Sequence, residues 1–115
     1  MSQRALKRVI LEMGTGNSLQ GRDYTQAAIR AVEDAMHHSS LPLLSSLDID
    51  PQTVEIEVTI GAQEPDKVDI DAVSGQLKFG HVTARAVKGG LNVPREGDKA
   101  PVVIVNAGLV VRVPV

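Results

Sequence analysis

The clearest pattern in the sequence is a stripe of apolar positions at helical spacing between residues 24 and 36. Asp23 is a good helix N-cap, and Gln26 three positions later completes a capping-box pattern. The stripe consists of Tyr24, Ala27, Ala28, Ala31, Val32, Ala35 and Met36. The pattern predicts a helix that begins after Asp23, packs this stripe on a core, and ends near Ser39 and Ser40, before Pro42.

Four other segments have the patterns of β-strands. Ala5–Met13 is rich in β-branched residues and ends at Gly14, which predicts a buried first strand. Thr53–Gly61 alternates apolar and polar residues, which predicts a strand with one solvated, acidic face. His81–Lys88 predicts a third strand. The nearly unbroken apolar run Val102–Val113 predicts a fourth, which must be central or meet another subunit.

The connections between these strands carry weaker signals. Asp69 or Asp71 can cap a short helix that runs through Ala72 and Val73 to Leu77. Residues 91–101 are rich in charge, Gly and Pro, so they predict a long surface loop. Residues 106–108, Asn-Ala-Gly, predict a kink or bulge in the last strand.

The order of elements, β-α-β-α-β-β, predicts an α+β (α/β) fold with a mixed four-stranded sheet covered by two helices. A chain of 115 residues suffices for one core and is too short for two, so we expect a single domain over residues 1–115. Aromatic residues make up only 2% of the chain, so the core is expected to consist of Val, Ile, Leu and Ala. The margin of stability is modest at this size, and oligomerisation commonly supplements it.

Composition excludes several classes of function. The 12 basic and 14 acidic side chains are spread along the chain, and aromatic residues are scarce, so we expect no nucleic-acid partner. The absence of cysteine excludes disulfides, Cys-based zinc sites and a thiol nucleophile. No apolar run approaches the roughly 18 residues that span a bilayer, and the N-terminus has no signal-peptide pattern. We therefore expect a cytoplasmic protein without a membrane partner, a metal or a cofactor.

Three glycines between the first strand and the helix mark the best candidate site. Gly14–Gly21 is expected to form a loop whose backbone N–H groups, with the helix dipole, favour an anion. The glycine spacing is neither the dinucleotide-binding nor the Walker pattern, and a glycine turn without a ligand is the alternative. The candidate ligand-binding residues in this segment are Gly14, Gly16, Asn17, Ser18, Gln20 and Gly21.

The same segment carries a resemblance that runs nearly end to end. Residues 14–21, followed by Asp23, Thr25, Ala27 and Ala28, and later residues 89–91 and 103–107, resemble a small uncharacterised bacterial family. This family is named for a Listeria conserved hypothetical protein, and its N-terminal signature is G-x-G-x-D-x-H-G. Here Ser18 stands where the family has Asp, and Gln20 where it has His. The resemblance implies a divergent member, such as a non-catalytic subunit that completes a site with a paralogous partner.

The element order also resembles Bacillus-type chorismate mutase and its trimeric relatives, in which clefts lie between subunits. By this analogy Arg85 and Arg112 could point into a cleft beside Arg8 and bind a carboxylate. The alternative is that these arginines are solvated or form structural ion pairs with Glu55 and Glu57. The glutamate and tyrosine of that enzyme's cleft are missing here, so we do not expect mutase activity.

The remaining polar residues give weak signals. His37 and His38 are adjacent, so on a helix they point in different directions, and solvation at the helix end is the favoured interpretation. His81 could act as a general base in an intersubunit cleft or be a structural histidine. The group Asp66, Asp69 and Asp71 could bind a hard cation, but helix capping and solubility explain it more simply.

These observations favour a small-metabolite-binding protein or a non-catalytic oligomer subunit. It would hold an anionic or amide-like ligand at the glycine segment and the subunit interface. The alternative is an enzyme of amidohydrolase or isomerase type with an intersubunit active site, which would use Asn17, Ser18, Gln20, Arg85 and His81. A third interpretation is that the apolar last strand only assembles the oligomer. We expect a homo-oligomer, a trimer in preference, or a hetero-oligomer with a paralogue.

Overall fold

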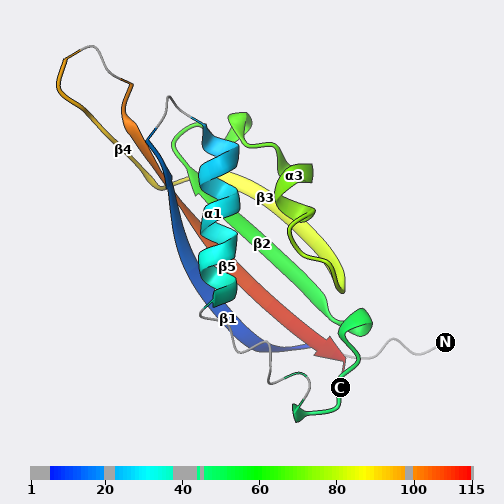
Figure 1. Cartoon of the computed structure of the whole chain (residues 1–115). Coiled ribbons are helices and arrows are strands. Elements are labelled where there is room, and N and C mark those ends of the chain that lie inside the picture. Colours follow the sequence, from blue (N-terminus) through cyan, green and yellow to red (C-terminus); the bar gives the residue numbers. More distant parts are fainter. Residues whose placement is uncertain (1–5, 20–22, 38–43, 45, 98–99, 115) are drawn as a thin grey trace.

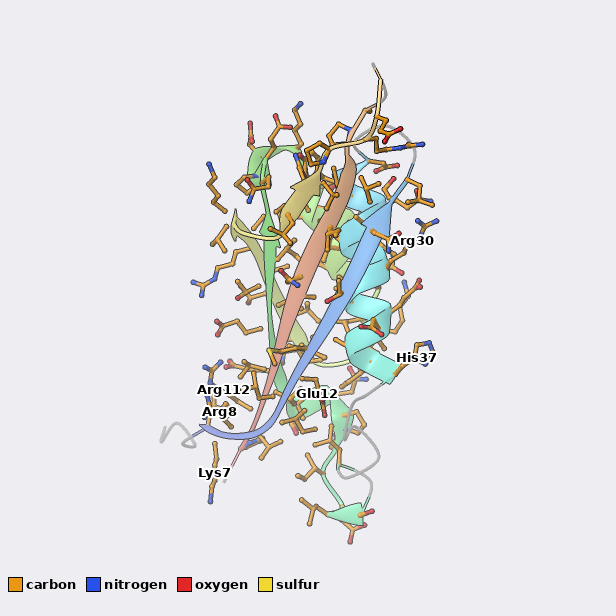
Figure 2. The ribbon with its side chains drawn as sticks, turned by 90° about the vertical axis from the view of Figure 1, so that its left-hand side faces the viewer. Lys7, Arg8, Glu12, Arg30, His37 and Arg112 are labelled. Atoms are coloured by element: carbon orange, nitrogen blue, oxygen red, sulfur yellow. The ribbon has the colours of Figure 1, made fainter. Side chains whose placement is uncertain are left out.

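The computed structural model describes residues 6–19, 23–37, 44, 46–97 and 100–114. Its strands are β1 (Leu6–Ser18), β2 (Glu55–Ala62), β3 (His81–Lys88), β4 (Leu91–Val93) and β5 (Val102–Pro114). Its labelled helices are α1 (Tyr24–His37) and the short α3 (Ile70–Ser74), with 3-10 turns η1 at Pro51–Thr53 and η2 at Pro65–Lys67. Figures 1 and 2 show α1 and α3 on one face of the sheet. The predicted mixed α+β fold is therefore confirmed.

The described residues form a sheet of five strands, whereas four were predicted. Its order is β1-β5-β2-β3, and β4 pairs with one end of β5. β5 is antiparallel to β1, β2 and β4, whereas β2 and β3 are parallel. The predicted central position of the last strand is confirmed. The added strand, β4, lies within the stretch predicted as a surface loop, where three residues add to the edge beyond β2.

The predicted kink in the last strand is wrong. β5 keeps its register with both neighbours through residues 106–108, so a continuous ladder holds the Asn-Ala-Gly step straight. The irregularity in the sheet instead lies in β1, between Arg8 and Ile10.

The core lies between the helices and one face of the sheet. The predicted stripe of α1 is buried, with Met36 partly so. β2 alternates buried and more exposed residues as predicted, and its buried residues belong to the same core cluster as those of α1 and β5. The core is built from Val, Ile, Leu and Ala, with Tyr24 as its one fully buried aromatic residue among those described. No described helix is long and apolar enough to span a membrane.

The predicted glycine loop is wrong over residues 14–18, because β1 continues through them to Ser18. Gly14 and Gly16 face α1. A Cβ at Gly14 would overlap the carbonyl oxygen of Ala31, and one at Gly16 would overlap that of Ala27. These glycines therefore let strand and helix backbones touch, which is a packing requirement and not a loop. The predicted site residues Gln20 and Gly21 lie outside the described residues.

The outer edge of β1 is covered by side chains of α1. The Thr15 N–H donates to the Asp34 carboxylate at 2.9 Å, and Arg30 Nη1 donates to the Asn17 carbonyl oxygen at 2.8 Å. Both contacts use backbone groups that would otherwise be free to pair with another strand. They also place the Arg30 guanidinium at the end of β1, next to Ser18.

Candidate functional site

A small pocket lies at the end of β1, beside the first turns of α1. Its volume is about 220 Å³, and Ser18, Leu19, Gln26 and Arg30 line it. Ser18 is only 1% exposed, and its Oγ has no hydrogen-bond partner in the described part of the chain. A buried hydroxyl without a partner costs about 1–3 kcal/mol. Such an atom marks a place where a water molecule or a ligand is expected.

Ser18 and a second polar residue, Asn92, flank the buried Val103 in one row across the sheet. Val103 of β5 pairs with Ser18 on one side and with Asn92 of β4 on the other. Asn92 Oδ1 is also buried and without a partner among the described residues. Asn92 Nδ2 donates to Tyr24 Oη at 2.7 Å, and Tyr24 Oη donates to Glu64 Oε2 at 3.0 Å. The otherwise apolar core is therefore polar at this end.

Two arginines hold the backbone on either side of Ser18. Arg30 donates to the Asn17 carbonyl oxygen, and Arg95 Nη1 donates to the Leu19 carbonyl oxygen at 2.9 Å. A guanidinium carries five N–H donors, so one such bond leaves others for a guest. Both arginines are exposed, so their charge is screened at long range but acts on a molecule in contact.

The N-terminus of α1 is capped as the sequence predicts. The Gln26 N–H donates to the Asp23 carboxylate at 2.9 Å. The Asp23 carboxylate therefore already binds one of the free N–H groups in the first turn of α1. The sequence pattern predicts an anionic ligand at these groups. An anion at this end of the molecule would therefore meet the exposed Arg30 guanidinium and compete with Asp23 for the helix amides.

The other predicted arginines lie on the face of the sheet opposite to α1. Arg85 and Arg112 line a depression of about 320 Å³ together with Glu55, Glu57, His81, Thr83 and Ile56. Arg112 Nη1 lies 2.9 Å from Glu57 Oε2, and Arg85 Nη2 lies 3.7 Å from Glu57 Oε1. The hydrogen bond from Arg112, with the charges of both arginines, lowers the pKa of Glu57 below its ordinary value of 4.5. The ion-pair interpretation is confirmed for Glu57.

The predicted ligand-binding residues do not form one site within a protomer. Ser18 pairs with Val103, and Arg112 lies nine residues farther along β5. At about 3.4 Å per residue these positions are roughly 30 Å apart. Figure 2 shows Arg30 toward one end of the sheet, and Arg8 and Arg112 together at the other. The residues of the enzyme alternative are divided in the same way, because His81 lies with the arginine depression.

The other candidates from the sequence are the aspartates near α3 and the histidines at the end of α1. Asp69 caps α3 by accepting the Ala72 N–H at 3.2 Å, as the capping interpretation predicts. His37 is the last residue of α1, and His38 lies outside the described residues. Among the residues that the structure describes, no three His, Asp or Glu side chains are grouped so as to hold a metal ion.

Sequence reasoning missed several residues around the Ser18 pocket. Gln26 and Arg30 are four residues apart on α1, so helical spacing places them on one face, beside the apolar stripe. That spacing was a usable signal. The sequence carries no such signal for Arg95 and Asn92. Their contacts join segments that are 76 and 68 residues apart in the chain.

Comparisons with known proteins place the chain in a family. The model of a family described as "Conserved hypothetical protein (Lin0512_fam)" matches residues 8–111. No curated protein matches. A solved structure, described as an FtsZ-like protein of unknown function from Nostoc punctiforme PCC 73102, superposes with a TM-score of 0.85. It is 30% identical, over 98% of this chain and 100% of that one. The likeness to the chorismate mutase fold stays a prediction. The chain belongs to this conserved hypothetical protein family.

Proposed function

We propose that the protein binds a small carboxylate or amide in the pocket formed by Ser18, Leu19, Gln26 and Arg30. The observation that carries this proposal is the Ser18 hydroxyl, which is 1% exposed and has no partner among the described residues. Ser18 lines the pocket together with Leu19, the Gln26 amide and the Arg30 guanidinium. A guest that hydrogen bonds to Ser18 would remove the penalty of an unpaired buried group.

The chemistry of the pocket decides the class of guest. The Ser18 hydroxyl and the Gln26 amide can each donate and accept, whereas the Arg30 guanidinium only donates. A carboxylate or a primary amide offers acceptor oxygens to all three. The pocket volume of about 220 Å³ corresponds to roughly seven water molecules at about 30 Å³ each. A small organic acid or amide is therefore the matching size, and a nucleotide is not.

Recognition fits this pocket better than catalysis does. None of the lining residues that the structure describes is a carboxylate or an imidazole, the groups that most often transfer protons in enzymes. The Ser18 hydroxyl has no base among these residues that would activate it as a nucleophile. We therefore favour a metabolite-binding protein over an enzyme that works at this pocket.

The test is an amide NMR titration of the full chain with acetate, succinate, acetamide and urea. We expect at least one probe to shift the amide signals of Ser18, Leu19 and Gln26 in a saturable way. The Ser18→Ala and Arg30→Gln variants should each bind about tenfold or more weakly, the loss of one charge-assisted or buried hydrogen bond.

Arg85→Gln is the matched control, since it removes an arginine from the opposite face and should bind as the wild type does. The proposal fails if none of the probes shifts these signals, or if Ser18→Ala binds as tightly as the wild type while keeping its fold.

A further inference from the structure

The face of the sheet opposite to α1 carries exposed apolar side chains. Leu11 and Met13 of β1 are 56% and 74% exposed, and Leu91 of β4 is 61% exposed. The register places them on one face, because Leu11 pairs with Val110, Met13 with Gly108 and Leu91 with Ile104, which alternate with the buried residues of β5. No described helix covers this face (Figure 2). Leu11 and Met13 are neighbours on this face, whereas the Thr15–Asn106 pair separates them from Leu91. Exposed apolar patches are places where interaction sites are expected.

A hollow lies next to the most exposed of these side chains. It has a volume of about 400 Å³, and its lining includes Met13, Thr15, Asn106 and Gly108, with Asp34 of α1 where the hollow reaches the edge of β1. Gly108 is directly opposite Met13 in the register of β1 and β5. A protruding apolar side chain and an adjacent cavity thus occupy neighbouring positions on the same face.

In the part of the chain that the structure describes, no contact requires a glycine at position 108. A Cβ added there would come no closer than 4.0 Å to another atom, the Thr59 carbonyl oxygen, and Gly108 is not among the glycines with positive φ. Gly14 and Gly16, by contrast, are required by the contact with α1. A glycine inside a strand destabilises it by about 0.5–1 kcal/mol relative to alanine. Such a glycine often marks the close approach of something outside the strand.

We infer that a second copy of this chain packs on this face, with the Met13 side chain of each copy in the hollow beside Gly108 of the other. A twofold axis brings the same patch of two copies together, so residue i of one contacts residue j of the other and the reverse. Met13 and the hollow lie side by side. A single twofold axis between them therefore places the Met13 side chain of each copy in the hollow of the other. An unrelated partner would need its own apolar side chain to fill the hollow. A second copy of this chain already has one, Met13.

The size of the face agrees with such a contact. Strands about 4.8 Å apart, with about 3.4 Å per residue, give a face of roughly 15 by 40 Å, or about 600 Å² before side-chain relief is counted. Standard interfaces bury about 600–1,000 Å² on each partner. The other end of the face carries Arg8, Arg85 and Arg112 together with Glu55 and Glu57, since Arg8 pairs with Arg112 in the register. Charges of both signs are therefore present there.

The test is sedimentation velocity on the full chain over a range of concentrations. We expect a wild-type dimer, with Met13→Asp and Gly108→Val shifted to the monomer by at least tenfold in dissociation constant. Both changes point away from the core, and circular dichroism should show unchanged secondary structure. Leu47→Asp is the matched control, because Leu47 is 54% exposed but lies outside the strands, and it should stay dimeric.

Crosslinking gives a second readout that does not depend on destabilising the contact. The chain has no cysteine, so Met13→Cys introduces a single thiol. Two such thiols across the twofold axis should be joined rapidly by a short bismaleimide, and those of Leu47→Cys should not. A wild-type monomer at every concentration, a trimer, or folded Met13→Asp and Gly108→Val variants that remain dimeric would each overturn the inference.

Discussion

Replacing Gly16 with alanine is the sharpest test of how α1 sits on the sheet. The new Cβ would overlap the Ala27 carbonyl oxygen and lie 2.8 Å from Arg30 Cβ. Real Cβ atoms essentially never approach other atoms within 3.0 Å, so the helix must retreat from β1. We therefore expect Gly16→Ala to destabilise the fold, although alanine normally stabilises a strand relative to glycine.

The magnitude follows from what the helix buries. The buried methyl groups of Ala27, Ala28, Ala31 and Ala35 are worth about 0.8 kcal/mol each, and Val32 about 2 kcal/mol. A gap of 0.5–1 Å forfeits about a quarter to a half of such contacts. The loss is therefore about 1.5–2.5 kcal/mol, which falls within the usual range for overpacking.

The assay is urea unfolding of the wild type, Gly16→Ala and a control, Gly61→Ala. Gly61 also lies in a strand, but a Cβ there would come no closer than 3.4 Å to its neighbours. Its replacement should be neutral or stabilise by about 0.4–1 kcal/mol. If Gly16→Ala proves as stable as the wild type, the close contact between β1 and α1 is wrong, and residues 14–18 could again be a loop.

Three further predictions follow from single contacts. Asp23→Ala should destabilise the protein by about 1 kcal/mol in urea unfolding, because the Gln26 N–H loses its cap; Asp23→Asn should restore most of it. Ser18→Ala should make the ligand-free protein more stable by about 1 kcal/mol, since an unpaired buried hydroxyl is removed; a loss of similar size would mean that Oγ has a partner. Glu57→Gln should lower the melting temperature at neutral pH. Because the pKa of Glu57 is depressed in the fold, the difference from the wild type should fade as the pH drops from 4.5 through the folded pKa, and a constant difference would contradict the ion pairs.

The sequence allowed most of the fold to be predicted, because its strongest signals are local. The helix over residues 24–37 and the strand His81–Lys88 follow from periodicity, and Asp23 and Asp69 cap their helices as expected. β4 was not predicted, because a strand of three residues has too few positions to show an alternating pattern.

The end of β1 was mispredicted for a physical reason. Glycines inside a strand and glycines in a loop look alike in one sequence, and only the position of α1 shows that Gly14 and Gly16 are needed for a backbone contact. Within one protomer the structure also separates Ser18 from Arg85 and Arg112, and their meeting at a subunit interface stays a prediction. Strand patterns do not say which end of β5 each residue approaches, and the register of a long central strand separates them.

The most direct test of the binding proposal is a high-resolution crystal structure of the wild-type protein soaked with acetate or acetamide. We predict that one of these probes occupies the pocket, with hydrogen bonds to Ser18 Oγ and to at least one of Gln26 and Arg30. A single water molecule on Ser18 Oγ in both soaks, or a side chain of this chain filling the pocket, would contradict the account.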